Sequence, residues 1–130
     1  MKLTIFLCFG FLLLGDVSLA LSAEDEGESL YAANCSVCHR PKGEGIENVF
    51  PPLQDNAYVL GDPAILVQTV LEGRGGMPSY QSSLNDQQLS QLISYVRKNF
   101  GNNGDAVSPA LINQVRTSGS EKITSDHDVQ

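Results

Sequence analysis

The chain has 130 residues, with 15 acidic against 8 basic side chains and a formal net charge of −7 at pH 7. This length fits a single domain, and a hydrophobic content of 42% is that of a globular chain. The acidic balance argues against binding to nucleic acid or to anionic lipid, since both need a basic patch. Chemistry-bearing residues are rare, with 3 Cys, 2 His, 2 Met and no Trp, so each can be assigned by elimination.

The first residues have the pattern of a secretory signal peptide. Lys2 is followed by an apolar run over residues 3–15 and then by small residues up to Ala20 and Ala23. An uncleaved membrane anchor is the alternative, but the apolar run spans only about 20 Å as a helix, short of a bilayer core of roughly 30 Å. Extending the run to Ala23 would bury Asp16. We therefore expect export to the periplasm with cleavage after Ala23 or Ala20, and contact with a membrane only if the leader stays.

A first helix is predicted over residues 26–38, and it ends in a distinctive motif. Cys35-Ser36-Val37-Cys38-His39 is the C-x-x-C-H signature of covalent haem c attachment. Two thiols about one helical turn apart can add to the two vinyl groups on one edge of a porphyrin. The histidine that follows is then placed to ligate the iron through Nε2. The motif predicts one haem c, attached through Cys35 and Cys38, with His39 as an axial ligand.

Three other interpretations of the motif fit less well. A redox dithiol would follow a β-strand, and no strand pattern precedes Cys35. A structural zinc site needs four ligands, but there is no second cysteine pair and His127 lies in a polar tail. A simple disulfide leaves His39 without a role.

The middle of the chain leads from the motif to a candidate sixth ligand. A glycine-rich loop over residues 40–48 and an extended segment over residues 50–53 precede a helix, which starts at Asp62 (N-cap) and Pro63 and ends at Gly73.

The candidates for the second axial position are Met77, His127, a lysine or an open site. Met77 lies in Gly-Arg-Gly-Gly-Met-Pro, where glycines let the backbone approach a ligand and Pro78 stiffens the segment after the sulfur. A methionine that only fills a core would sit in a helix or strand. Met77 is therefore the predicted thioether ligand, and His127 is expected to be solvated.

The last strong element is a helix that starts at Asn85 (N-cap) and stops near Gly101. Its apolar stripe follows helical spacing and consists of Leu89, Leu92, Ile93, Val96 and Phe100. A further short helix is predicted over residues 107–116 and a polar tail over residues 117–130. Because period-two strand patterns are absent, the fold class is all-α, with three to five helices packed around one covalently attached haem.

Taken together, these residues resemble a class I c-type cytochrome, and the resemblance runs from about Gly27 to Phe100. The family pattern places Gly27 and Tyr31 on the first helix, where it crosses the last helix beside Tyr95. The resemblance thus implies the small cytochrome c fold, with residues 1–23 as signal peptide, residues 24–104 as the haem domain and residues 105–130 as a short helix and tail.

The resemblance also implies further residues around the haem. The family uses a proline carbonyl to hold Nδ1–H of the haem histidine, and Pro51 is the first choice here, with Pro52 as the alternative. Leu53 and Tyr58, together with Ile93, would pack on the ring. Because the chain has no Trp to place near a propionate, Arg74 or a tyrosine hydroxyl would serve instead.

The predicted function is periplasmic one-electron transfer, with the haem cycling between Fe(III) and Fe(II) and no substrate chemistry. The expected partners are redox proteins: a dehydrogenase, an oxidase or a reductase. The protein is expected to be a monomer that binds them in transient complexes. One alternative is a haem c subunit that accepts electrons within a periplasmic dehydrogenase complex. The others are a ligand-binding or peroxidase-like protein, if Met77 leaves the iron readily, and a disulfide-linked binding module without haem.

Overall fold

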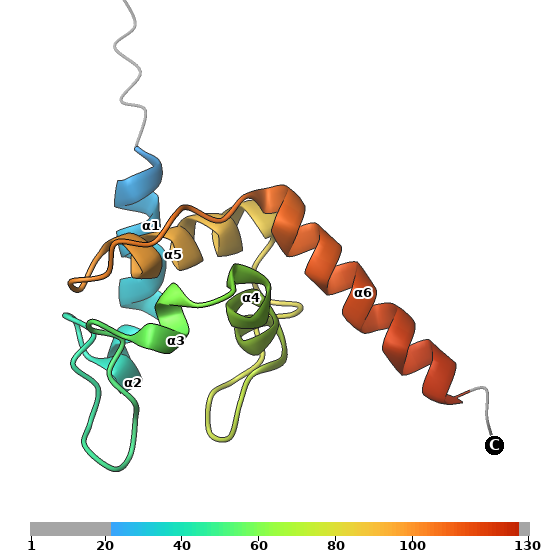
Figure 1. Cartoon of the computed structure of the whole chain (residues 1–130), viewed down its shortest axis with the longest axis horizontal. Helices are drawn as coiled ribbons and strands as arrows, with labels where there is room; N and C mark the ends of the chain where they lie inside the picture. Colours follow the sequence, from blue (N-terminus) through green and yellow to red (C-terminus); the bar gives the residue numbers. More distant parts are fainter. Residues whose placement is uncertain (1–21, 128–130) are drawn as a thin grey trace, which may run out of the picture.

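The structure is a computed structural model that describes residues 22–127, so residues 1–21 of the predicted signal peptide lie outside it. The described residues contain no β-strand, only two isolated bridges, and the all-α prediction is confirmed (Figure 1). Their helices in chain order are α1 (Ala23–Asn34), α2 (Ser36–His39), α3 (Ala57–Leu60), α4 (Pro63–Glu72), α5 (Asp86–Lys98) and α6 (Pro109–His127).

The predicted first helix is broken in two at the first cysteine of the motif. Ser22 begins α1 with a capping box, in which its side chain accepts from the Asp25 amide while the Asp25 carboxylate accepts from the Ser22 amide. Cys35 leaves helical geometry, with φ −122° and ψ −33°, and α2 then carries the chain to His39. The break turns the second cysteine and the histidine onto a helix of their own.

Helices α1 and α5 cross at Gly27, and this crossing is the main tertiary contact of the fold. A Cβ on Gly27 would lie 2.6 Å from the Gln91 carbonyl oxygen and 2.8 Å from the Tyr95 Cβ, so only glycine allows this approach. Beside the crossing, the ring of Tyr31 lies 5.7 Å from that of Tyr95 and 4.9 Å from that of Phe100. The crossing implied by the cytochrome resemblance is therefore present.

The starts of α4 and α5 follow the sequence closely, whereas α5 ends at Lys98 and leaves Phe100 outside the helix. The Asp62 side chain accepts from the Ala64 amide, with Pro63 in the first turn. Asn85 is the expected N-cap of α5, and with Gln88 it forms a capping box. The apolar faces of these helices and of α1 meet in one core, which contains Leu30, Tyr31, Val59, Leu66, Val67, Leu71, Tyr80, Leu89, Leu92, Ile93, Val96, Val107 and Ile112.

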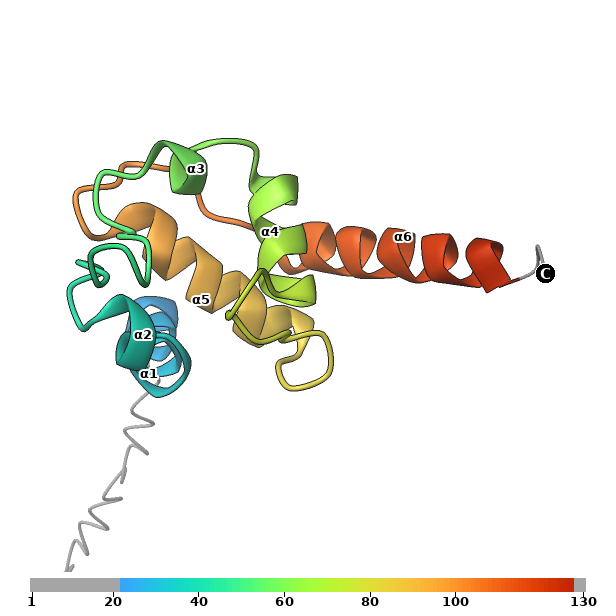
Figure 2. The same cartoon turned by 90° about the horizontal axis from the view of Figure 1, so that it is seen from below.

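The last helix is longer than predicted, because α6 continues over residues 117–127, where the sequence suggested a tail. No proline follows Pro109, so nothing in the sequence forces an earlier stop. Residues 99–108 turn back along α5 and bring the start of α6 to the beginning of α5, after which α6 leaves the body of the molecule (Figures 1 and 2). No helix in residues 22–127 combines the length and the apolar character needed to cross a membrane.

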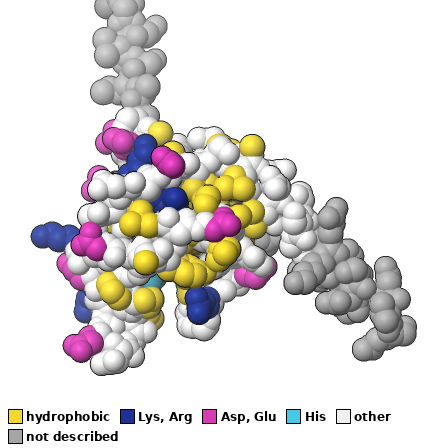
Figure 3. Space-filling view, in the orientation of Figure 1, with side chains coloured by type: hydrophobic (Ala, Val, Ile, Leu, Met, Phe, Trp, Pro, Cys, Tyr) yellow, Lys and Arg dark blue, Asp and Glu magenta, His cyan; other side chains and the backbone are white. Residues whose placement is uncertain are grey.

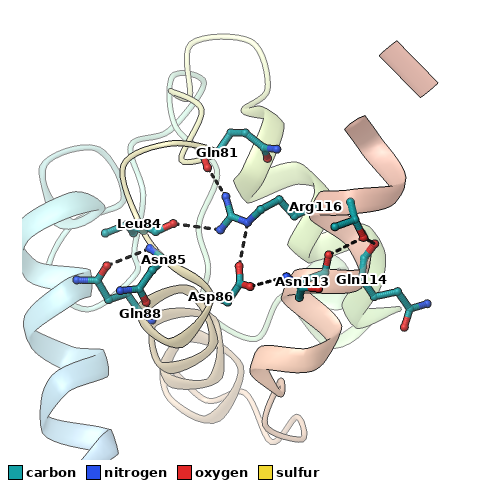
Figure 4. A network of polar contacts seen from close by, with 9 residues as sticks. Gln81, Leu84, Asn85, Asp86, Gln88, Asn113, Gln114 and Arg116 are labelled. Atoms are coloured by element: carbon teal, nitrogen blue, oxygen red, sulfur yellow. Dashed lines mark hydrogen bonds and ion pairs between the residues drawn. The ribbon is translucent and has the colours of Figure 1, made fainter. Parts of the chain in front are cut away.

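Polar contacts fix the start of α6 to the rest of the fold (Figure 4). The Arg116 guanidinium lies 2.8 Å from the Asp86 carboxylate, and it also donates to the carbonyls of Gln81 and Leu84. Asn113 donates to the same carboxylate at 3.0 Å. Because Asp86 stands in the first turn of α5, this network ties the extension to the helix that carries the core.

Candidate haem-binding site

The predicted haem ligands come from two segments far apart in the sequence, α2 and the loop after α4. Figure 1 shows both segments on the same side of the helical body, below α5 in that view. In Figure 3, which has the orientation of Figure 1, hydrophobic side chains gather in the middle of the visible face, and part of a histidine side chain shows at their lower edge. One candidate ligand belongs to α2 and the other to the loop after α4, so the fold brings the two segments to one side of the helical body.

Both cysteines of the motif are free thiols and half-buried, and Cys35 packs against the hydrophobic core. Burial, helped by the neighbouring Cys38, raises the pKa of the Cys35 thiol to about 11. A thiol that stays protonated at neutral pH lacks the low pKa typical of redox dithiols. The described residues also contain no group of three His, Cys, Asp or Glu side chains that could hold a metal ion.

His39 has one ring nitrogen engaged by the chain itself. Its Nδ1 lies 2.9 Å from the Pro51 carbonyl oxygen, and because a carbonyl can only accept, Nδ1 carries the proton. In the neutral ring Nε2 is then the nitrogen without a proton, which is the one that can ligate a metal. The Pro52 carbonyl instead accepts from the Asn56 side chain at 2.6 Å, so of the two prolines Pro51 is the one bonded to the histidine.

The contact between His39 and Pro51 depends on the loop between them. The Gly45 amide donates to the His39 carbonyl at 2.9 Å, and Ile46 and Phe50 close a bridge with two hydrogen bonds of 2.8 Å. Gly45 has φ +69°, and a Cβ there would lie 2.7 Å from the Pro52 nitrogen. The glycine-rich loop thus lets the proline segment fold back over the histidine.

Met77 is half-buried and packs against the core at the end of a tight loop. Arg74 and Met77 close this loop with two backbone hydrogen bonds, of 3.3 and 3.0 Å. Gly73 opens it with φ 78° and ψ 171°, a conformation reserved essentially for glycine. A Cβ on Gly73 would lie 2.5 Å from the Met77 carbonyl oxygen, so the position of the methionine depends on this glycine.

The remaining predicted residues have different surroundings. Leu53 is half-buried, packs against the core and accepts from the Asn102 side chain at 2.8 Å. Tyr58 is 42% exposed. Its hydroxyl lies 2.6 Å from Thr69 Oγ1, and the exposed Arg74 guanidinium lies 5.7 Å from the centre of its ring. His127 ends α6, and its side chain lies outside the described ones.

Sequence reasoning missed three residues that hold the site together. Arg97, in the last turn of α5, is 5% exposed and donates to the carbonyls of Val59, Gly61 and Asp105. Asn102 is 1% exposed and bonds the Val96 and Leu53 carbonyls and the Asn56 amide. Tyr80 is buried, and its hydroxyl donates to the Asn34 carbonyl. All three hydrogen-bond to main-chain groups, which leave no pattern in a sequence.

The residues present fit a haem c. Two thiols stand at attachment spacing, an imidazole has Nε2 available, and a thioether on a second loop packs against the hydrophobic core. Together with the all-α fold, this donor set defines the chain as a c-type cytochrome, the class of electron-transfer proteins that carry haem c bound covalently. More narrowly, the chain belongs to the family described as cytochrome c oxidase, cbb3-type, subunit III, whose model matches residues 22–96.

Curated relatives agree with this family. The chain is 32% identical over 116 residues to an alcohol dehydrogenase (quinone), cytochrome c subunit, of Gluconobacter oxydans, with 79% of this chain and 24% of the relative covered. It is 35% identical over 82 residues to a cbb3-type cytochrome c oxidase subunit CcoP of Azospirillum brasilense, covering 58% and 28%. It is 28% identical over 116 residues to a fructose dehydrogenase cytochrome subunit of Gluconobacter japonicus, covering 78% and 24%. The chain spans about a quarter of the length of these relatives.

Proposed function

We propose that the protein is a periplasmic one-electron carrier whose single haem c is ligated by His39 and Met77. When bound, the haem supplies one-electron chemistry at its iron. The observation that carries the proposal is the 2.9 Å contact between His39 Nδ1 and the Pro51 carbonyl, which fixes the tautomer with Nε2 free. Cys35 and Cys38 would hold the group, and Met77 would supply a sulfur that favours the reduced state more than a second histidine would.

Arg74, Tyr58 and Leu53 complete the proposed site. Thr69 Oγ1 donates to the Ile65 carbonyl at 3.0 Å, so the Tyr58 hydroxyl is the donor in its contact with Thr69. Held in this way, the Tyr58 ring supports the Arg74 guanidinium. Arg74 would place a positive charge near a haem propionate, in the role that a tryptophan cannot fill here, and Leu53 would pack on the ring.

The test of the axial ligands is an absorption spectrum of protein matured with haem in a periplasm. A weak band near the red end of the ferric visible spectrum reports iron–sulfur ligation, and we expect it in the wild type. It should be lost in both Met77→Ala and Met77→His, with the iron turning high-spin in the first and staying low-spin in the second. Val49→Ala, at a side chain 64% exposed, is the matched control and should keep the band. Absence of the band in the wild type would refute Met77 ligation.

A second candidate function is that of a haem subunit, serving as electron acceptor in a periplasmic dehydrogenase or oxidase complex. The relatives favour this function, because each is named as a subunit of such an enzyme and each is several times longer than this chain. Purification from the native source distinguishes the two. Stable association with a larger polypeptide supports the subunit, whereas a monomer reduced in transient encounters supports the free carrier.

Export and domain limits form part of the proposal. Residues 1–23 would act as a cleaved signal peptide, residues 24–104 as the cytochrome domain and residues 105–130 as an extension. The two expected cleavage sites differ in effect, because cleavage after Ala20 keeps the Ser22 cap of α1 while cleavage after Ala23 removes it. N-terminal sequencing of the exported protein decides between the two sites and tests export itself.

A further inference from the structure

The loop that carries Met77 is held at two places, and the two are of different kinds. On the α4 side, the Tyr80 amide donates to the Val70 carbonyl at 3.2 Å, and the Ser79 hydroxyl donates to the Leu71 carbonyl at 2.5 Å. On the other side, the Tyr80 hydroxyl donates to the Asn34 carbonyl oxygen at 2.7 Å, across 46 residues of sequence.

The second contact joins the Met77 loop to the end of α1, next to the haem-attachment motif. Asn34 is the last residue of α1 and directly precedes Cys35, and carbonyls at a helix end lack partners within the helix. Within residues 22–127, it is the only hydrogen bond that joins the loop of residues 73–80 to the segment of residues 22–40. A single hydroxyl therefore connects the methionine side of the site with the cysteine side.

The surroundings make the contact durable. Tyr80 is 7% exposed and belongs to the hydrophobic core, so little water can compete for the Asn34 carbonyl. Burial raises the pKa of the Tyr80 hydroxyl, so the hydroxyl stays a donor at neutral pH. A phenylalanine would fill the same volume but leave the carbonyl without its partner.

We propose that Tyr80 is a positioning residue that latches the Met77 loop onto the haem-attachment helix and so keeps the thioether from leaving the iron. The inference rests on the proposed function, because it takes Met77 as the ligand. The hydroxyl acts through the loop, because its partner is the Asn34 carbonyl. Its expected contribution is about fivefold in the equilibrium between closed and open loop, the value of one hydrogen bond of ~1 kcal/mol.

The test is competition by added imidazole for the ferric iron, followed through loss of the red-edge band. In Tyr80→Phe, imidazole should displace the sulfur at about fivefold lower concentration than in the wild type. Tyr31→Phe is the matched control, since it removes an equally buried hydroxyl that donates to the Arg40 carbonyl at 2.6 Å, away from the Met77 loop. Tyr31→Phe should leave the imidazole titration unchanged. Far-ultraviolet circular dichroism confirms that both variants are folded.

The outcomes separate this inference from the function on which it rests. A wild type with the red-edge band, whose imidazole affinity rises in Tyr80→Phe alone, supports the latch. Equal affinities in the wild type and Tyr80→Phe, or equal shifts in both tyrosine variants, overturn the latch while Met77 ligation stands. A wild type without the band overturns both.

Discussion

The three glycines around the Met77 loop give a graded test of how the loop is built. Gly73, Gly75 and Gly76 lie within four positions of one another, yet their surroundings differ. A Cβ on Gly73 would meet the Met77 carbonyl oxygen at 2.5 Å and the Pro78 carbonyl carbon at 2.9 Å. A Cβ on Gly75 or on Gly76 would meet nothing within 4 Å, but Gly75 has φ +59° whereas Gly76 is not in the positive-φ region. Alanine at each site therefore adds a different physical cost.

The costs can be estimated separately. Gly76→Ala should be neutral or slightly stabilising, by ~0.5 kcal/mol, because alanine restricts the unfolded chain. At position 75 an alanine would be strained only by the left-handed backbone conformation, so Gly75→Ala should lower the stability of the loop by about 1 kcal/mol. Gly73→Ala meets a backbone conformation reserved for glycine, at ~1–3 kcal/mol, and a backbone overlap that costs a further ~1–3 kcal/mol. The sum for Gly73→Ala is about 4 kcal/mol, or roughly three orders of magnitude in the population of the native loop.

The assay combines denaturant unfolding with imidazole competition for the ferric iron. We expect Gly73→Ala to lack the red-edge band, or to lose it at imidazole concentrations far below those that the wild type needs. Gly75→Ala should need roughly fivefold less imidazole than the wild type, and Gly76→Ala should match the wild type. Equal behaviour of Gly73→Ala and Gly75→Ala would refute the reasoning, since it would mean that the close approach to the Met77 carbonyl has no consequence.

Three further changes test other parts of the structure. Arg97→Met should lower the free energy of unfolding by about 3 kcal/mol, because buried carbonyls lose a charged donor; a urea titration showing under 1 kcal/mol would contradict this. The hydrogen bond from Asn113, together with the ion pair to Arg116, holds the pKa of Asp86 below its usual range. Asp86 therefore adds stability above its unfolded pKa near 4, and this contribution is lost as the pH falls through the lower folded pKa. The difference in free energy of unfolding between the wild type and Asp86→Asn should therefore become smaller as the pH is lowered from 7 to about 3. A difference that is constant with pH would count against the network. In Cys35→Ser the haem should be attached through one thioether only. The remaining vinyl group should shift the pyridine-haemochrome spectrum, and an unshifted spectrum would argue against attachment at this cysteine.

The helix starts, the haem motif and the fold class could be predicted from short stretches of the sequence. Capping residues such as Asp62 and Asn85 act on amides within three residues of themselves, so the starts of α4 and α5 could be located without any tertiary information. The C-x-x-C-H motif is equally local, because attachment chemistry requires its two thiols within one helical turn. The fold class and the cofactor followed from such short-range features.

Other features depended on contacts between distant segments, and the sequence alone could not supply them. The family resemblance favoured Pro51 over Pro52, but only the fold of the loop around Gly45 shows which carbonyl meets His39. Arg97 stands in the last turn of α5, where a basic side chain usually points to solvent, and it is buried only because residues 99–108 return along the helix.

The sequence by itself determined that this chain is a helical protein with a haem attachment motif and one methionine in a glycine-rich loop. The tertiary structure decided how the two sides of the site are joined. The tyrosine that links them, Tyr80, donates to a main-chain carbonyl, and every residue offers such a carbonyl. A side chain that recognises only the backbone leaves no partner residue to find in the sequence, and so the contact became visible only when the fold brought the two segments together.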